Sequence, residues 1–587
     1  MNISAIKMTP RRMAALLAVL AAIVYTTGRA LVIWPELYAL RLPDNDDVMR
    51  LAEVRDWIAG QGFHDLMQYR LGPPGGASMH WSRIADAGPA ALIVLFRIFL
   101  NDHDATLSSV IVYQLILLLC YLLIASRIAR ELIGEQAMPI AVIFAALAFP
   151  TIALLIPGRI DHHGLQIVLC MVVLWSLVAR PGWTSGVIGG LCAALSLAIG
   201  LEVAPELVAA IGVLGLIWVV RGNSENHRLT GFAVSLGVTT AALLIFARPE
   251  VWPREWCDGF TPASTYAILG AALSIGIMAA FGNKLQSPRA RLAAAAICGS
   301  VALGWALVVA PVCFKGPYGA LDPFLKHVWM DNVSEASGLF EGQATPGAAI
   351  AFGGLILAGL LAVIPLVRNP ATRERWWPYA LFLLAGALAT VAQIRVSYIM
   401  AGAAIFPFVA HMVAAKDDPA RLGRRLLLWI AGAGVTWNAL SIALDLSIAP
   451  REYRASQAFA ESCTSPSGME RLAKLPRGTV MAPLDIGAYV IGMTAHRSMA
   501  APYHRNNQGN MAMYRFFMAS PERAQILAKK QAIDYVALCP TSFDQPVMNP
   551  YRKGALFTQL QTGEVPDWLT RISPPGATML LFLVRKH

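Results

Sequence analysis

The chain contains a series of long apolar runs, and this feature decides what it can fold into. A helix of about 20 residues crosses the roughly 30 Å of hydrocarbon in a lipid bilayer. Thirteen runs of suitable length precede residue 447, and we predict that each forms a transmembrane helix: 13–34, 106–126, 137–156, 164–180, 185–201, 204–220, 230–247, 263–281, 292–313, 347–367, 377–393, 396–415 and 425–446. The sequence therefore predicts a mainly α, polytopic membrane protein.

The composition excludes soluble classes of protein. Hydrophobic residues make up 56% of the chain and charged residues only 14%, whereas a soluble protein is about 25% charged. The formal charge of +11 is typical of cytoplasmic loops in a membrane protein, so we expect no nucleic-acid partner. The first run follows Lys7, Arg11 and Arg12 and is too long for a removable signal peptide. We interpret it as a transmembrane helix with a cytoplasmic N-terminus.

Basic residues in the loops predict the orientation, because short cytoplasmic loops collect Lys and Arg. The segment 87–100 is apolar but short, and we place it as an interfacial helix in the first outer loop. With this choice the basic loops all fall on the cytoplasmic side: Arg127 and Arg130, Arg180, Arg221 and Arg228, Lys284 to Arg291, Arg368 to Arg375, and Lys416 to Arg425. We therefore expect a multi-pass protein of the bacterial inner (plasma) membrane.

Three long segments then face the periplasm. They are the first outer loop at 35–104, a second loop at 314–346, and a tail at 447–587. The tail has ordinary polarity, with short strand-like patterns at 478–482, 488–491 and 535–538 and a helical pattern at 508–531. We predict a transmembrane domain at 1–446 and a small periplasmic α/β domain at 447–587. Cys463 and Cys539 could pair in that oxidising compartment.

The first outer loop opens with three acids, Asp44, Asp46 and Asp47. Carboxylates this close raise one another's pKa unless a cation neutralises them. The pattern suggests a hard divalent ion such as Mn²⁺ or Mg²⁺ with oxygen ligands. A solvated acidic turn is the alternative interpretation.

A second polar cluster, Asp161, His162 and His163, lies between two predicted spans. A carboxylate and two imidazoles at membrane depth are costly and usually functional. Metal binding or catalysis is our preferred interpretation, although Asp161 could also cap the following helix.

Three further features carry positive or acidic side chains toward the same face. Glu335 lies in the second long loop, and Arg395 lies between two apolar runs. Arginine is well suited to grip a phosphate, although Arg395 could instead snorkel to the interface. Trp81 and Arg83 in the first loop place another arginine beside aromatic surface.

Taken in order along the chain, these segments resemble the catalytic subunit of oligosaccharyltransferase, in the GT-C superfamily of polyprenol-dependent membrane glycosyltransferases. The resemblance rests on Asp44–Arg50, Gly158–His163, Asn332–Glu335, Arg395 and the outer C-terminal domain. It implies catalytic roles for Asp44, Asp46, Asp47, Asp161 and Glu335. It further implies a divalent metal, Mn²⁺ or Mg²⁺, on Asp46, Asp161 and His163, where His163 replaces the usual second acid of its motif. Donor-phosphate binding would fall to Arg395, Arg83 and Trp81.

The tail departs from this family. The Trp-Trp-Asp-Tyr-Gly motif that reads an asparagine acceptor is replaced by Pro483–Tyr489, without either tryptophan. Asp485, Tyr503, His504 and Arg505 are the residues we expect on the acceptor side. The resemblance implies a glycosyltransferase that moves a sugar or oligosaccharide from a polyprenyl-phosphate or -pyrophosphate donor to a glycan, lipid or protein acceptor. A transporter or flippase of lipid-linked glycans is the competing hypothesis, with Glu202, Glu206 and Asp445 as its candidate residues.

Overall fold

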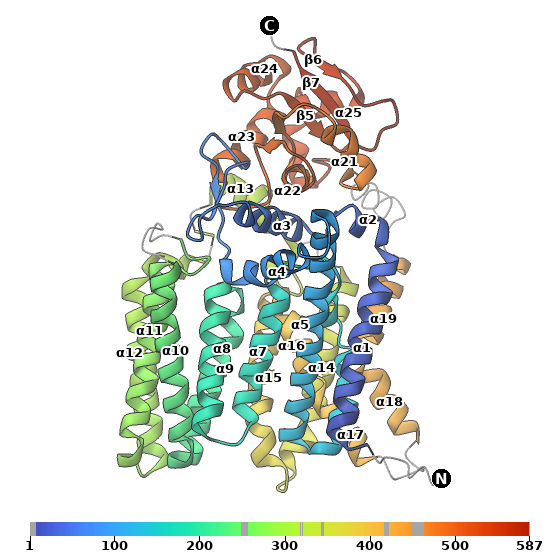
Figure 1. The fold of residues 1–587 in the computed structure, drawn as a ribbon. Helices are drawn as coiled ribbons and strands as arrows, with labels where there is room; N and C mark the ends of the chain where they lie inside the picture. Colours follow the sequence, from blue (N-terminus) through green and yellow to red (C-terminus); the bar gives the residue numbers. More distant parts are fainter. Residues whose placement is uncertain are drawn as a thin grey trace.

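A computed structural model describes residues 8–247, 256–316, 318–319, 321–341, 345–415, 422–448 and 463–585. Long helices form one bundle, and a smaller domain with a β-sheet sits on one end of it (Figure 1). The fold is mainly α with a small C-terminal sheet domain, as predicted. Lys7, Lys416, Arg421 and the start of the predicted tail, 449–462, lie outside the described residues.

All thirteen predicted runs contain helix. The straight helices are α1 (Pro10–Val32), α5 (Asp102–Leu132), α7 (His163–Val178), α8 (Trp183–Ile199), α9 (Ala204–Arg221), α10 (Asn226–Ala247), α11 (Pro262–Phe281), α12 (Pro288–Val309), α14 (Pro346–Arg368) and α15 (Arg373–Ala392). Seven described segments are long and apolar enough to cross a membrane by length and composition, or eight if one bent pair is counted as a span. The number thirteen remains a prediction.

Three of the predicted spans are interrupted. Run 137–156 forms α6 (Met138–Ala145) and the 3₁₀ segment η2 (Thr151–Leu155), with Pro150 between them. Run 396–415 divides into α16 (Ser397–Ala403) and α17 (Phe406–Ala414), and α18 (Leu422–Gly432) meets α19 (Gly434–Ile448) at 69°. Proline lacks the N–H that an α-helix interior requires, which accounts for the first break and places Pro407 at the start of α17.

The first outer loop lies across the same end of the bundle as the sheet domain (Figure 1). It contains α2 (Trp34–Tyr38), α3 (Asn45–Ile58), the hairpin strands β1 (Met67–Gln68) and β2 (Ala77–Ser78), and α4 (Arg83–Phe96). Helix α4 covers the segment that we expected to be interfacial. It does not run through the bundle, and Val94, Ile98 and Phe99 at its end are exposed.

The second long loop is built from short helices. It contains η7 (Pro311–Lys315), α13 (Pro323–Val328), η8 (Met330–Asn332) and η9 (Ser334–Ala336). Apolar side chains of this loop, including Leu325 and Val328, belong to the same core as the sheet domain. The loop is therefore packed beneath the C-terminal domain.

The C-terminal domain is built on a five-stranded sheet in the order β4-β3-β5-β7-β6. Its strands are β3 (Thr479–Met481), β4 (Arg497–Ser498), β5 (Tyr535–Leu538), β6 (Leu569–Arg571) and β7 (Leu580–Val584), and its helices are α21 (Pro466–Ala473), α22 (Leu484–Met493), α23 (Asn507–Met518), α24 (Pro521–Lys530) and α25 (Leu556–Thr562). Strand β3 pairs in parallel with β4 and β5, whereas β7 is antiparallel to β5 and β6.

One predicted strand is wrong. Residues 488–491 belong to helix α22. A short apolar run that is buried on all sides lacks the periodicity that separates a strand from a helix. The strands predicted at 478–482 and 535–538 and the helical pattern at 508–531 correspond to β3, β5, and α23 with α24.

The first outer loop and the C-terminal domain are joined into one unit. Leu71 bridges to Ser498 beside strand β4, and helix α22 packs on α3. A Cβ atom on Gly492 would lie 2.0 Å from Val48 Cγ1, so this close helix contact requires glycine. The contact fixes the position of the acidic N-terminus of α3 relative to the tail.

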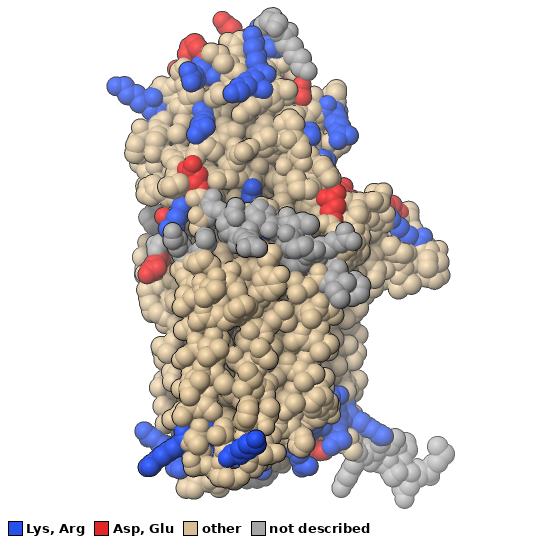
Figure 2. All heavy atoms as spheres, turned by 90° about the vertical axis from the view of Figure 1, so that its left-hand side faces the viewer, with Lys and Arg blue, Asp and Glu red and all other residues tan. Residues whose placement is uncertain are grey.

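The two ends of the molecule differ in their basic residues and in their disulfides. Lys and Arg side chains gather at the end of the bundle opposite the C-terminal domain, and an uncharged belt separates the two (Figure 2). The disulfides Cys257–Cys313 and Cys463–Cys539 belong to segments at the C-terminal-domain end, whereas the free cysteines Cys120, Cys170, Cys192 and Cys298 lie in bundle helices. The predicted Cys463–Cys539 pair is present.

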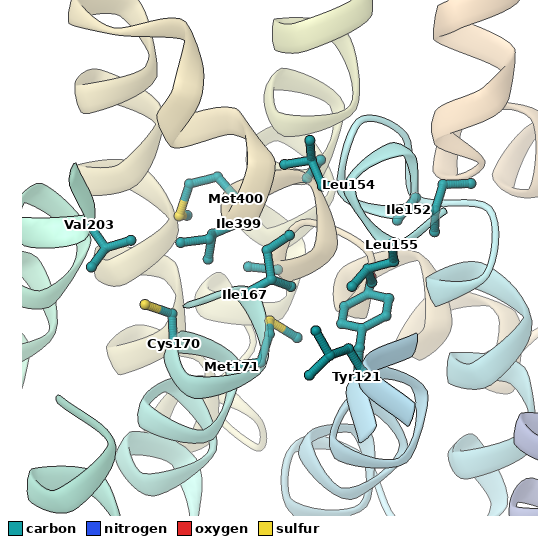
Figure 3. Close-up of a cluster of buried hydrophobic side chains, with 14 of the residues drawn as sticks. Tyr121, Ile152, Leu154, Leu155, Ile167, Cys170, Met171, Val203, Ile399 and Met400 are labelled. Carbon is teal, nitrogen blue, oxygen red and sulfur yellow. The ribbon is translucent and has the colours of Figure 1, made fainter. Parts of the chain in front are cut away.

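An apolar core supports the end of the bundle beneath this outer layer. Tyr121 of α5, Leu155 of η2, Ile167 and Met171 of α7, and Met400 of α16 converge there (Figure 3). These side chains are almost fully buried. Because packed interiors resist deformation, the polar residues that begin α7 and α16 rest on a rigid base.

Candidate functional site

A cavity of about 1110 Å³ lies between the bundle, the outer loops and the C-terminal domain. Its wall combines acids and cations with an apolar side that includes Phe149, Leu154, Leu201 and Phe352. Such a mixture can hold an apolar chain together with a charged head group. The predicted residues that line it are Asp44, Asp46, Glu335, Arg395, Asp485, Tyr503 and His504.

At one side of the cavity, Arg159 binds the two predicted acidic motifs together. Asp44 caps helix α3, and its Oδ2 atom lies 2.7 Å from Arg159 Nη1. Asp161 Oδ2 lies 2.8 Å from Arg159 Nη2, and Asp47 Oδ2 lies 3.6 Å from Nε. The Asp161 backbone N–H also donates to Asp47 Oδ1 at 2.9 Å. Three carboxylates, two from the start of α3 and one from the segment before α7, thus share one guanidinium.

Asp161 also caps the N-terminus of the helix that follows it. Its Oδ1 atom accepts the backbone N–H of His163, the first residue of α7, at 3.0 Å. The capping interpretation and the cluster interpretation therefore hold together. Burial alone would raise the pKa of Asp161, but Arg159, His163 and His162 outweigh burial and lower the pKa to about 2.

Asp46 and Asp47 experience the opposite balance. Burial, and after it the neighbouring acids Asp44, Glu335, Asp161 and Glu202, raise the pKa of Asp46 well above its usual value. Burial is also the main cause that raises the pKa of Asp47, although Arg159 opposes it. Negative charge is in excess around Asp46, and a cation there would relieve it.

Glu202 is the centre of a second network at the cavity wall. Its Oε1 atom lies 3.0 Å from Arg395 Nη1, and its Oε2 atom lies 2.5 Å from His162 Nε2 and 3.7 Å from His163 Nδ1. Arg395 Nη2 lies 3.3 Å from Glu335 Oε1. Arg395 is 94% buried and held on two carboxylates, so it is not a snorkelling surface residue.

The described residues bring His162, His163 and Glu202 close enough to share an ion, with ligand atoms within 4.8 Å of one another. His162, however, has no lone pair to offer. Arg50 donates to its Nδ1 atom at 3.2 Å, because a guanidinium can only donate, and Nε2 then carries the hydrogen that Glu202 accepts. Of the other two, both oxygens of Glu202 are already engaged, by Arg395 and by His162.

The predicted metal set of Asp46, Asp161 and His163 is not brought within that distance as a group among the described residues. Asp161 is directed to Arg159. The surrounding chemistry nevertheless fits a divalent cation, since the carboxylates of Asp44, Glu335, Asp161 and Glu202 place excess negative charge around Asp46.

Two residues predicted to bind donor phosphate lie elsewhere. Arg83 is buried beside Asp86, at 3.1 Å, and stacks on Trp57. Trp81 is buried beneath Arg50 and against Tyr503. Neither lines the cavity. Both side chains stabilise the first outer loop, because the buried Asp86 requires a cation and Trp81 provides apolar surface for Arg50.

The predicted acceptor-side residues lie where the C-terminal domain forms part of the cavity wall. Asp485 begins helix α22, and burial raises its pKa. Tyr503 donates to the Asn45 carbonyl at 3.1 Å and so ties the tail to α3. His504 and Arg505 both contact Asp258, a residue of the segment before α11. Arg505 supports this wall from behind.

The sequence interpretation missed Arg159, Asp258 and Tyr318, and considered Glu202 only as a transport residue. Glu202 sits in Gly-Leu-Glu-Val between two apolar runs, which is the same signal of polarity at a span end that identified Asp161. Asp445 has a structural role, because its carboxylate accepts from Thr345 and from the Gly347 backbone at the start of α14.

No family model and no curated protein matches this chain. Solved structures do. The chain is similar to the archaeal oligosaccharyltransferase AglB from Archaeoglobus fulgidus in complex with an inhibitory peptide and a dolichol-phosphate, with a TM-score of 0.66, 16% identity, and coverage of 98% of this chain and 74% of that one.

Two other structures of the Archaeoglobus fulgidus enzyme give the same result. The apo form matches with a TM-score of 0.63 at 14% identity over 93% of this chain and 72% of that one. A complex with Zn and sulfate matches with a TM-score of 0.60 at 15% identity over 92% and 69%. This likeness confirms the fold that the sequence predicted, the GT-C fold of oligosaccharyltransferases.

Proposed function

We propose that this protein is a glycosyltransferase that moves a sugar or oligosaccharide from a polyprenyl-phosphate or -pyrophosphate donor to a glycan, lipid or protein acceptor. The observation that carries the proposal is a single cavity lined by Arg395, Glu202 and Glu335 together with Asp44 and Arg159, where Arg159 also pairs with the buried Asp161. The fold and an AglB structure that contains a dolichol-phosphate and an inhibitory peptide support this choice of donor and acceptor classes.

Arg395 is our candidate for the donor phosphate. Negative charge grows on the phosphate oxygen as the bond to the anomeric carbon breaks, and a preorganised cation stabilises that charge in the transition state. Glu202 and Glu335 hold the guanidinium in place, which avoids reorganisation during the reaction. The apolar wall at Phe149, Leu154 and Phe352 suits the prenyl chain. We expect a single displacement with inversion, because none of the described carboxylates is set aside as a nucleophile.

For a divalent metal, Mn²⁺ or Mg²⁺, to be held by Asp46, Asp161 and His163, with Glu202 beside His163, these side chains would have to move closer together than they lie in this structure, and Asp161 would have to turn from Arg159. When bound, such an ion supplies positive charge for the leaving phosphate. The excess of carboxylates around Asp46 supports this assignment, as does the Zn in one related structure.

The competing flippase hypothesis has less support. It requires ionisable residues along a path through the bundle, yet Asp445 caps a helix and Glu202 belongs to the site at the outer end. Glu206 is buried one turn below Glu202 and is the remaining candidate of the three.

We place the site on the periplasmic face of a bacterial inner membrane. The basic residues opposite the C-terminal domain (Figure 2) and the disulfides on its own end support this orientation. Reporter fusions after Arg368 and after Arg585 should report the cytoplasm and the periplasm, respectively. Two reporters on the same side of the membrane would contradict the proposed orientation.

Binding of a polyprenyl phosphate tests the role of Arg395 directly, with the matching polyprenol as the phosphate-free control. Arg395→Gln should weaken binding of the polyprenyl phosphate by about 10- to 100-fold, since hydrogen bonds to charged groups contribute about 1.5–3 kcal/mol. Binding of the polyprenol should be unchanged. An equal loss of affinity for both lipids would mean that the substitution only disturbs the fold. Unchanged affinity for both would show that Arg395 does not bind the donor phosphate.

A further inference from the structure

The wall of the cavity also contains an aspartate–histidine pair. Asp258 Oδ2 is hydrogen-bonded to His504 Nε2, although the two residues are 246 positions apart. His504 belongs to the C-terminal domain, and Asp258 to the segment between α10 and α11. Both line the cavity, and their side chains are 14% and 6% exposed.

Asp258 is held in one orientation by a fork of two hydrogen bonds. Arg505 Nη2 lies 2.7 Å from Oδ1, and Arg505 Nε lies 2.8 Å from Oδ2. The guanidinium stacks over Trp256, with its carbon 3.9 Å from the ring centroid, and donates to the Met79 carbonyl at 3.0 Å. Burial would raise the pKa of Asp258, but the hydrogen bonds from His504 and Arg505 outweigh burial and lower it, so the carboxylate is ionised.

The same fork argues against a metal on this wall. His80, Asp258 and His504 offer ligand atoms within 4.8 Å of one another. Both oxygens of Asp258 are already engaged, however, and Arg505 supplies the positive charge that an ion would otherwise bring. A second cation would lie beside that guanidinium and be repelled.

The pairing fixes the tautomer of His504. An ionised carboxylate can only accept hydrogen bonds, so Nε2 of His504 carries the hydrogen and Nδ1 carries the lone pair. Within the described part of the chain, no hydrogen-bond partner of Nδ1 is present. An imidazole with a free lone pair, oriented by a fixed carboxylate, has the organisation of a general base.

Two rings from the outer loops face His504. His80 of the first outer loop lies with its ring centroid 4.8 Å away, and Tyr318 of the second outer loop lies 5.2 Å away. Burial lowers the pKa of His80 well below its usual value, so His80 is neutral and adds no opposing charge. Asp258 supplies the negative charge and Arg505 the nearest positive charge.

Tyr318 connects this wall to the donor side. Its ring contacts His504, and its hydroxyl interacts with Arg395. Tyr318 therefore contacts both the proposed base and the proposed phosphate-binding arginine, so a sugar whose phosphate is held by Arg395 would lie beside His504.

We propose that His504 is the general base that takes the proton from an acceptor hydroxyl, with Asp258 as its positioning residue, and that the acceptor is an alcohol of a carbohydrate or lipid. This inference rests on the proposed function. The acceptor oxygen forms a bond to the anomeric carbon as the bond from that carbon to the donor phosphate oxygen breaks. The electron pair leaves with the phosphate, and the acceptor proton moves to His504 Nδ1.

The test uses membranes of a deletion strain that expresses the wild type, His504→Gln or His504→Asn, with tritium-labelled native lipid-linked saccharides as the probe. Transfer of label from the lipid pool is followed from about pH 5 to 8. Loss of a general base should lower the rate by about 10²- to 10⁴-fold. The variant should also lose the decline that the wild type shows at acidic pH, and added imidazole should restore part of its rate. The product should contain an O-glycosidic bond.

His64→Gln is the matched control, because His64 is an exposed histidine of the first outer loop that does not line the cavity. It should behave as the wild type. Monodisperse elution in detergent at an unchanged yield shows that the His504 variants are folded.

Three outcomes would overturn the assignment of His504. They are a wild-type rate and pH profile in both folded variants, an N-glycosidic product, and a loss of activity that accompanies loss of a bound metal. Failure of the wild type to consume labelled lipid would instead refute the proposed function.

Discussion

Replacing Arg159 by glutamine removes the one cation that three acidic side chains share. Asp161 is 1% exposed and Asp44 is 45% exposed. The contact of Arg159 with Asp161 therefore contributes more to stability than its contact with Asp44. A buried carboxylate that loses its partner costs about 3–5 kcal/mol, and Asp161 falls at the lower end because it keeps the His163 N–H. The exposed contact adds about 0–1 kcal/mol. We expect a destabilisation of about 3–4 kcal/mol.

The assay is the temperature at which the purified protein in detergent loses its monodisperse gel-filtration peak, with and without Mn²⁺. Arg97→Gln in the same outer loop is the matched control, because its pair with Asp102 is exposed and is worth at most about 1 kcal/mol. Arg159→Gln should melt several degrees lower than this control in metal-free buffer, and Mn²⁺ should restore part of the difference, because a divalent cation can replace the lost charge. A melting temperature equal to that of Arg97→Gln would refute the reasoning.

Two further predictions concern the outer layer. Burial raises the pKa of Glu53 from 4.5 to about 8, so the folded state keeps a proton that the unfolded state releases, and the resulting stability is lost as pH rises from about 4.5 through 8. Melting temperatures across that range should fall more steeply for the wild type than for Glu53→Gln, and parallel curves would contradict this. Gly492→Ala should cost about 1–3 kcal/mol by overpacking against Val48, and Val48→Ala should rescue part of that loss in thermal unfolding. A double variant no more stable than Gly492→Ala would exclude this contact as the cause.

Much of the architecture follows from local sequence properties. Helix positions depend on apolar length, so all thirteen runs contain helix, and the placement of α4 followed from the charge bias of the loops. The helix α22 was missed because a short, fully buried apolar run has no diagnostic period. Its identity depends on the contact of Gly492 with Val48, which lies 444 positions away and cannot be seen locally.

The site was predictable by residue type but not by pairing. Asp161 and Arg395 were identified because charge at a span end is costly. The same rule applied to Glu202, whose neighbours Arg395 and His162 belong to distant segments, so its role depended on the fold. Trp81 and Arg83 show the reverse error: an arginine beside an aromatic residue suits a phosphate site, yet here both side chains are buried with Asp86 and Arg50.

We propose that the acids at the outer end of the bundle support transfer of a lipid-linked sugar. The most direct test measures release of polyprenyl phosphate from labelled lipid-linked saccharides by the purified protein, compared with Asp161→Asn. We expect release by the wild type and a rate at least about 100-fold lower in a variant that remains folded. An equal rate in Asp161→Asn, or no release by the wild type under any metal condition, would contradict the account.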